Sequence, residues 1–360
     1  MKTSFQIGRI MGIPIRLHIT FLLILPVFVL AFAGNPAPFF GDIQPAGLRY
    51  MLSTAAVLLL FAGILVHEVM HSYFAIRNGV KVQNITLLLL GGVSSMSEIP
   101  RNPSVEWKMA FVGPATSLVI GGALVFAYEM VVPGFNAGDP YLRLLWLTGT
   151  INLMLGIFNL IPAFPMDGGR ILRAWLAGRM PYVQATHTAA YVGKMFAFTM
   201  GIAGLLIPNI WLILIAFFIY IGASEEEKGT EIAFTLEGVS VRDIMSEDVV
   251  SVPPDMSIAG LVDLMFEEKH MGYPVVERGS LIGIVTFSDV RNIPREKRGE
   301  VRVSDVMSPR VLSVSPGDRA VDVLKLLNSN GIGRTIVIQD GRVVGIVSRT
   351  DLVRSIQLLS

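Results

Sequence analysis

The feature that most constrains this chain is a pair of histidines at the end of an apolar run long enough to cross a membrane. The run extends from Met51 to Val66, and His67-Glu68-Val69-Met70-His71 follows it directly. Residues four apart lie on one face of a helix, so both imidazoles can reach one metal ion, and Glu68 is placed to take a proton from water there. A chance match to this pattern is the alternative. Because ionisable groups inside a membrane helix are costly, the position favours a metal-dependent active site.

The composition indicates a membrane domain joined to a soluble one. Of 360 residues, 52% are hydrophobic and 16% are charged, whereas a soluble domain averages about a quarter charged residues. Nearly all long apolar runs lie in residues 1–223. We therefore expect a polytopic α-helical membrane domain over 1–223, a linker over 224–238 and a soluble α/β domain beyond it.

Charge and cysteine usage exclude several classes of site. The net charge of +1 gives no electrostatic basis for nucleic-acid binding. The chain has no cysteine, which excludes disulfides, iron–sulfur clusters and thiolate zinc sites. Histidine and carboxylate side chains are therefore the expected ligands of a transition metal.

About six membrane spans are expected from the apolar runs, most of them near the length that a bilayer requires. They are residues 16–33, 52–76, 107–132, 142–162, 189–207 and 209–223. Lys and Arg concentrate at the N-terminus and in the connections after the second and fourth spans. The positive-inside rule then predicts a multi-pass protein of the cell membrane with both termini in the cytoplasm. The N-terminal run also resembles a signal peptide, but its length favours a retained span.

A third metal ligand is expected where the fourth span breaks. A catalytic zinc usually takes three protein ligands, and Asp167 follows two prolines, Pro162 and Pro165, that end the helix. Counting from the span ends places Asp167 and His67 at similar depth in the membrane. A surface turn is the alternative for Asp167 and the two glycines after it, and the matching depth favours ligation.

The two patterns together resemble the site-2 protease family of intramembrane zinc metalloproteases. The resemblance rests on the histidine motif and on the segment Asn159-Leu-Ile-Pro-Ala-Phe-Pro-Met-Asp167-Gly, and it covers about residues 1–223. It implies cleavage of a membrane-protein substrate in or near a transmembrane segment. The site that it implies has Zn²⁺ bound by His67, His71 and Asp167, with Glu68 as catalytic base and Asn159 helping to hold the substrate carbonyl.

The same family has a glycine-rich, membrane-associated extended segment, which residues 87–96 fit. The resemblance implies substrate-binding positions there at Gly91, Gly92, Val93 and Ser94. A helical substrate hides its carbonyls in its own hydrogen bonds, so it must unwind before hydrolysis. An exposed strand edge can hold an unwound segment by strand addition. A re-entrant loop packed on the second span is the alternative.

Residues 239–298 and 301–360 repeat with an offset of 62, as Gly283-Ile-Val-Thr286 and Gly345-Ile-Val-Ser348 illustrate. Each copy predicts a strand, a helix, two short strands and a helix. The copies resemble a tandem pair of CBS domains, named for cystathionine β-synthase, which bind adenine nucleotides or dimerise. The resemblance implies a homodimer through this pair, or contacts to the ribose of ATP or AMP from Thr286, Asp289, Ser348 and Asp351. Helix capping is the alternative role of these side chains.

The leading hypothesis is therefore an intramembrane zinc endopeptidase with a nucleotide-sensing or dimerising CBS pair. A CBS-regulated transporter or channel for a metal ion is the main rival, but a transporter is expected to have a broken helix in each half, and only one span is broken here. An inert relative is a third possibility, against which the complete motif argues. Arg170 and Arg173 are interpreted as signals of cytoplasmic topology.

Overall fold

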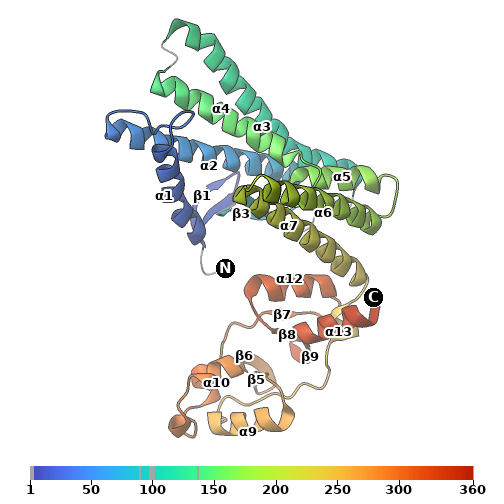
Figure 1. Cartoon of the computed structure of the whole chain (residues 1–360). Helices are drawn as coiled ribbons and strands as arrows, with labels where there is room; N and C mark the ends of the chain where they lie inside the picture. The colour runs from blue at the N-terminus through green and yellow to red at the C-terminus, as the bar shows by residue number, and fades with distance from the viewer. Residues whose placement is uncertain (1–3, 89–90, 97–101, 136–137, 360) are drawn as a thin grey trace. The chain divides into compact units, whose positions relative to one another are not determined.

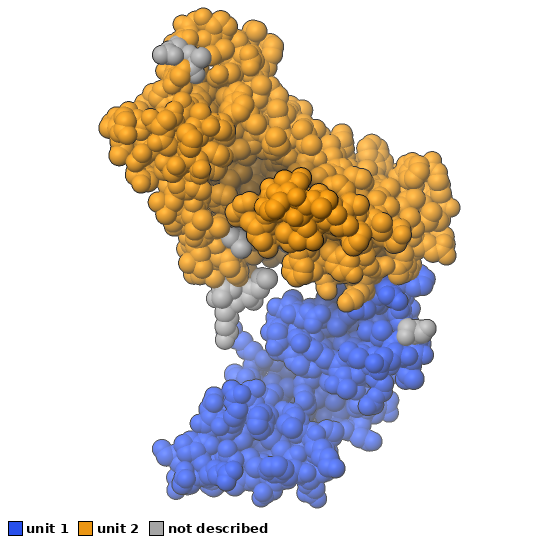
Figure 2. Space-filling view, in the orientation of Figure 1, with its two compact units in different colours: residues 1, 231–360 blue, residues 2–230 orange. Residues whose placement is uncertain are grey.

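The computed structural model describes residues 4–88, 91–96, 102–135 and 138–359. The chain divides into two compact units, residues 2–230 and residues 231–360 (Figures 1 and 2). The first unit is mainly helical. Its helices are α1 (Ile19–Gly34), α2 (Ala46–Arg77), α3 (Pro103–Val131), the 3-10 turn η1 (Val132–Gly134), α4 (Pro140–Asn159), α5 (Asp167–Ala177), α6 (Tyr182–Leu206) and most of α7 (Ile210–Thr235).

Four helices in the described part of the chain are long and apolar enough to cross a membrane. They are Ala46–Arg77, Pro103–Gly134, Pro140–Asn159 and Tyr182–Leu206. Helix α1 is apolar but only 16 residues long. The apolar half of α7 is followed by Glu225, Glu226 and Glu227 within the same helix. The structure therefore offers four span candidates where the sequence predicts six.

The N-terminal segment differs from the sequence prediction. Residues 16–18 belong to strand β2 (Ile13–His18) and not to the first span, since α1 begins at Ile19. Strand β1 (Ser4–Ile10) pairs antiparallel with β2 across a tight turn at Met11 and Gly12, both with positive φ. The two strands adjoin an apolar helix directly, so hydropathy alone merges β2 with that helix.

A four-stranded sheet of order β1-β2-β3-β4 packs against α2. Strand β3 (Val82–Leu88) is parallel to β2 and antiparallel to β4 (Gly91–Met96). Ile13, Ile15 and Ile85 are buried together against partly buried side chains of α2. Strand β4 ends the sheet, so one backbone edge of β4 has no strand partner in the described chain.

The connection between α4 and α5 packs so closely against the start of α5 that two positions there have no room for a side chain. Helix α4 ends at Asn159 and α5 begins at Asp167, so the prolines lie in the connection, as predicted. A Cβ atom on Gly168 would lie 2.2 Å from the carbonyl oxygen of Ile161, and one on Gly169 would lie 2.5 Å from the backbone nitrogen of Phe164. The first turn of α5 therefore rests directly on the backbone of the break, which fixes the position of Asp167.

A buried ion pair joins α5 to α3 and α7. Arg173 is 2% exposed and Glu106 is fully buried. Arg173 Nε donates to Glu106 Oε1 at 2.7 Å, and Arg173 Nη1 donates to Glu226 Oε1 at 2.7 Å. Burial raises the pKa of Glu226, but the charges of Arg170 and Arg173 outweigh burial and hold it below its ordinary value. The interpretation of Arg173 as a topology signal is therefore incomplete, because its charge also holds three helices together.

The second unit contains two copies of one motif. The first has α8 (Val241–Ile244), α9 (Ile258–Glu268), β5 (Gly272–Glu277), β6 (Ser280–Thr286), α10 (Phe287–Arg291) and the 3-10 turn η2 (Arg295–Lys297). The second has α11 (Val303–Val306), β7 (Ser313–Val314), α12 (Ala320–Asn330), β8 (Arg334–Gln339), β9 (Arg342–Ser348) and α13 (Arg349–Leu359). The predicted order of elements is present, with the first strand of the first copy reduced to a parallel bridge between Val252 and Val275. Residues 224–235 of the predicted linker are helical, because α7 continues through them.

The buried ion pair predicts a large difference between two stability mutants of the membrane unit. Glu106→Ala leaves Arg173 buried with one carboxylate fewer, so it should lower the free energy of unfolding by about 3 kcal/mol. Asp42→Ala removes the half-exposed pair between Asp42 and Arg143 and should cost at most about 1 kcal/mol. Denaturant unfolding of both variants in detergent measures this, and equal losses would contradict the role assigned to Arg173.

Candidate active site

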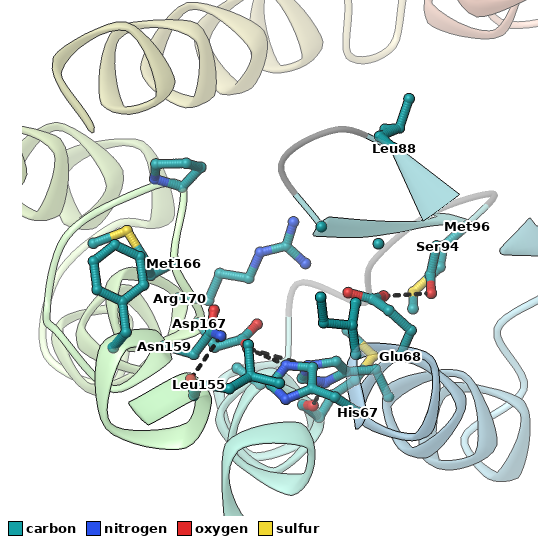
Figure 3. A pocket seen from close by; sticks show the side chains of 18 of the residues that line it. His67, Glu68, Leu88, Ser94, Met96, Leu155, Asn159, Met166, Asp167 and Arg170 are labelled. Atoms are coloured by element: carbon teal, nitrogen blue, oxygen red, sulfur yellow. Dashed lines mark hydrogen bonds and ion pairs between the residues drawn. The ribbon is translucent and has the colours of Figure 1, made fainter. Parts of the chain in front are cut away.

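Three potential ligand atoms meet between α2 and the start of α5. The Nε2 atoms of His67 and His71 lie 3.0 Å apart. Asp167 Oδ2 lies 3.2 Å from His67 Nε2 and 3.1 Å from His71 Nε2 (Figure 3). Within the described residues these three side chains form the one cluster of His, Cys, Asp or Glu that could hold a metal ion. Two imidazole nitrogens and one carboxylate oxygen, all largely buried, form a donor set suited to zinc.

Helix α3 orients both imidazoles from behind. His71 Nδ1 lies 2.7 Å from the carbonyl oxygen of Met109. A carbonyl only accepts hydrogen bonds, so Nδ1 carries a hydrogen, which leaves Nε2, beside Asp167, as the ring nitrogen able to bind a metal ion. His67 Nδ1 lies 3.0 Å from Ser117 Oγ on the same helix. Contacts of this kind fix the tautomer and the ring plane of metal-binding histidines.

A glycine lets α3 come this close. A Cβ atom on Gly113 would lie 2.2 Å from His71 Nε2 and 2.8 Å from His67 Nε2. Sequence reasoning did not identify Gly113, Met109 or Ser117. Their spacing along α3 predicts that they share a buried face of the helix. It does not predict that this face packs against α2.

Strand β4 lies directly against Glu68. Ser94 Oγ donates to Glu68 Oε2 at 2.7 Å (Figure 3), and Ser72 Oγ on α2 lies 3.2 Å from Ser94 Oγ. A Cβ atom on Gly92 would lie 2.4 Å from Glu68 Cγ. Gly92 and Ser94 are two apart in a strand and share the face toward α2. Residues 89–90 of the predicted extended segment, and the side chain of Val93, lie outside the description.

A cavity of about 600 Å³ opens onto the three ligand atoms. Glu68, Gly92 and Ser94 line one part of it, while Asn159 and Arg170 line another. Asn159 Nδ2 donates to the carbonyl oxygen of Leu155 at 2.9 Å, so one of its N–H groups is already used within α4. The structure therefore brings together the metal-ligand, base and strand positions predicted from sequence. It also places Arg170, for which the sequence indicates only a role in topology, at the same cavity.

A second cavity, of about 430 Å³, lies in the second unit and is lined by Ser348 and Asp351. Asp351 Oδ2 accepts hydrogen bonds from Ser348 N at 2.8 Å and Ser348 Oγ at 2.6 Å. Thr286 and Asp289 form the same capping arrangement in the first copy, but they do not line this cavity. Asp289 and Asp351 thus each use one carboxylate oxygen in a hydrogen bond that caps a helix. In the first copy that helix is α10, whose N-terminal capping residue is Thr286.

The two copies differ in charge at this cavity. Arg334 occupies the position that Gly272 has in the first copy, and Arg334 Nη1 donates to the Gly272 carbonyl oxygen at 3.3 Å. Burial lowers the pKa of Arg334, although the nearby charge of Asp351 opposes that effect. Four basic residues, Lys269, His270, Arg334 and Arg349, line the cavity.

Comparison with known families gives two matches. The model described as "Peptidase family M50" matches residues 55–141 and 130–200. The model described as "CBS domain" matches residues 241–296 and 303–358. The matches lie on the two compact units.

Named relatives extend over the whole chain. "Zinc metalloprotease MJ0392" of Methanocaldococcus jannaschii is 38% identical over 359 residues, covering 100% of this chain and 98% of its own length. "Putative zinc metalloprotease Rip3" of Mycobacterium tuberculosis is 31% identical and covers 99% of this chain and 94% of its own length. A solved structure titled "Site-2 Protease from Methanocaldococcus jannaschii" is 41% identical, covers 62% of this chain and 95% of its own, and has a TM-score of 0.47.

Because Gly113 lies against both imidazoles, we predict that a substitution at Gly113 abolishes zinc binding although all three ligand residues remain. Gly113→Ala places a methyl group against both Nε2 atoms, so zinc per purified protein should fall to less than about a tenth of the wild-type value. Gly122→Ala is the matched control, because its Cβ atom meets nothing within 4 Å on the same helix. Elemental analysis of both proteins decides, and full zinc content in Gly113→Ala would contradict the site.

Proposed function

Because the chain belongs to the site-2 protease family of zinc metalloproteases, peptidase family M50, and carries tandem CBS domains, we propose that it hydrolyses peptide bonds in or near transmembrane segments of other membrane proteins. The observation that carries this proposal is the convergence of His67, His71 and Asp167 beside Glu68 in an apolar helical unit. Relatives over the whole chain are named zinc metalloproteases, which favours hydrolysis over the transport of a metal ion.

His67, His71 and Asp167 would hold the zinc ion, and Glu68 would move the proton. Bound zinc would lower the pKa of water at the site and polarise the substrate carbonyl. Glu68 accepts the proton of the attacking water and returns it to the leaving amine. The hydrogen bond from Ser94 fixes Glu68 Oε2, which holds the carboxylate in one orientation for both transfers. Asn159 lines the same cavity, and its remaining N–H group is available to the substrate carbonyl oxygen.

The substrate is proposed to enter as an extended segment beside β4. An unwound segment exposes backbone N–H and C=O groups, each of which is costly without a partner in apolar surroundings. The free edge of β4 can satisfy one side of such a segment at Gly91, Gly92, Val93 and Ser94. Gly92 and Ser94 of the same strand contact Glu68, so a segment added to β4 would bring the scissile bond near the base.

A multi-pass arrangement with cytoplasmic termini is part of the same proposal. The four span candidates are completed by α1 and by the apolar half of α7, which gives the six spans expected from the sequence. The distribution of Lys and Arg favours a cytoplasmic side for Asp167 and the CBS unit.

Glu68→Gln tests the reaction. The amide keeps the size of the side chain and leaves the three metal ligands unchanged, but it cannot accept the proton. Zinc content should stay at the wild-type value while cleavage of a model transmembrane substrate falls by at least ~10²-fold. Near-full cleavage by this variant would exclude the proposed mechanism.

The CBS unit is proposed to bind an adenine nucleotide in the cavity beside Asp351. Asp351 has one carboxylate oxygen outside the capping arrangement, and this oxygen can accept a ribose hydroxyl. The basic residues that line the cavity suit the phosphates of ATP or AMP. Thr286 and Asp289 form the equivalent position of the other copy. Homodimerisation through the unit is the second role considered for it.

Two aspartate variants test nucleotide binding on the full chain. Asp351→Ala should weaken ATP or AMP binding by at least ~10-fold, because a ribose contact of the described cavity is lost. Asp289→Ala makes the same chemical change in the other copy and should weaken binding less. Calorimetry in detergent measures both, and no binding by the wild-type protein at millimolar nucleotide would favour dimerisation.

A further inference from the structure

Arg170 is a cation in the active-site cavity that the proposed reaction has not used. It lies in the first turn of α5, close after Asp167, and it lines the same cavity as His67 and Glu68. Figure 3 shows its side chain extending from α5 toward the space between Asp167 and β4. Its guanidinium makes no hydrogen bond or ion pair with any residue in the described part of the chain. Arg173, on the same helix, is paired with two carboxylates.

The charge of Arg170 acts on the carboxylates of Asp167, Glu106 and Glu226, but its N–H groups bond to none of them and are available to the substrate. A strand added to β4 pairs with the sheet along one backbone edge only. Its other edge points away from β4, and the carbonyl groups there have no partner in the sheet. Each such carbonyl is costly when water is excluded. A guanidinium offers five N–H donors in a fixed plane and no acceptor, which matches a row of carbonyl oxygens.

We propose that Arg170 binds the substrate by donating hydrogen bonds to backbone carbonyls on the edge opposite β4. This inference rests on the proposed function, and it adds a second wall to the substrate site. One wall is the edge of β4, and the other is the guanidinium on α5. Because backbone carbonyls are the acceptors, the contact does not depend on the side chains of the substrate.

If Arg170 serves only as a signal of membrane topology, a different effect of substitution is expected. A cation that serves only to keep its loop in the cytoplasm can be replaced by lysine without loss. A planar set of donors cannot, since lysine offers three donors on a compact charge. Arg170→Lys therefore separates the two roles, and Arg170→Met removes both the charge and the donors.

Substrate binding is measured with inactive, zinc-bound protein. In the Glu68→Gln background, the Kd for a fluorescent peptide with one transmembrane segment is determined in detergent micelles. Adding Arg170→Met should raise this Kd by at least ~10-fold, and adding Arg170→Lys should raise it by several-fold. Zinc content and the melting temperature should stay unchanged. Arg179→Met is the control, because Arg179 follows α5 but does not line the cavity.

The outcomes are distinct. An unchanged Kd in Arg170→Met refutes the inference and leaves the proposed function intact, provided that the Glu68→Gln parent binds zinc and peptide. A Kd in Arg170→Lys equal to that of the parent also refutes it, since charge alone would then suffice. Loss of binding only for peptides with Asp or Glu near the cleavage position overturns it in favour of carboxylate recognition. A parent that binds neither zinc nor peptide refutes the proposed function itself.

Discussion

Two imidazoles and a carboxylate within about 3 Å of one another, inside an apolar helical unit, need a proton or a cation among them. The surrounding structure serves to keep these three groups together. Gly113 lets α3 reach the back of both rings, and the contacts to Met109 and Ser117 leave each Nε2 atom facing Asp167. On the other side, the break between α4 and α5 holds Asp167 through backbone contacts at Gly168 and Gly169. The site therefore depends on close backbone approach as much as on its ligands.

The parts of the site that follow a local rule could be predicted from sequence. His67 and His71 share a helix face because of helical periodicity, and Asp167 was placed by counting depth from the span ends. Gly113 and Arg173 could not be placed in this way, because their roles depend on which helix lies opposite. Arg173 looks like any basic residue in a connection, yet its charge is neutralised by Glu106 and Glu226, which lie far from it in the sequence.

The strands and the repeat show the same distinction. Strand β2 adjoins α1 without a polar break, so a hydropathy pattern cannot separate them. The offset of 62 predicted the order of elements in the CBS unit, because both copies fold by the same local preferences. It also predicted equivalent roles for Asp289 and Asp351, and here the cavity is less symmetric than the repeat. Arg334, which stands in the second copy where the first has Gly272, adds a basic side chain to this cavity and donates a hydrogen bond to the Gly272 carbonyl oxygen of the other copy.

The separation of the proposed ligands along the chain bears on how the protein is made. His67 and His71 precede Asp167 by 100 and 96 residues. During synthesis the helix with both histidines enters the membrane well before the carboxylate exists, and two imidazoles alone leave a zinc ion short of its usual three protein ligands. The nascent chain is thus expected to stay unable to cut its neighbours until α5 has docked. Completion of the helical unit and the onset of hydrolysis would then coincide.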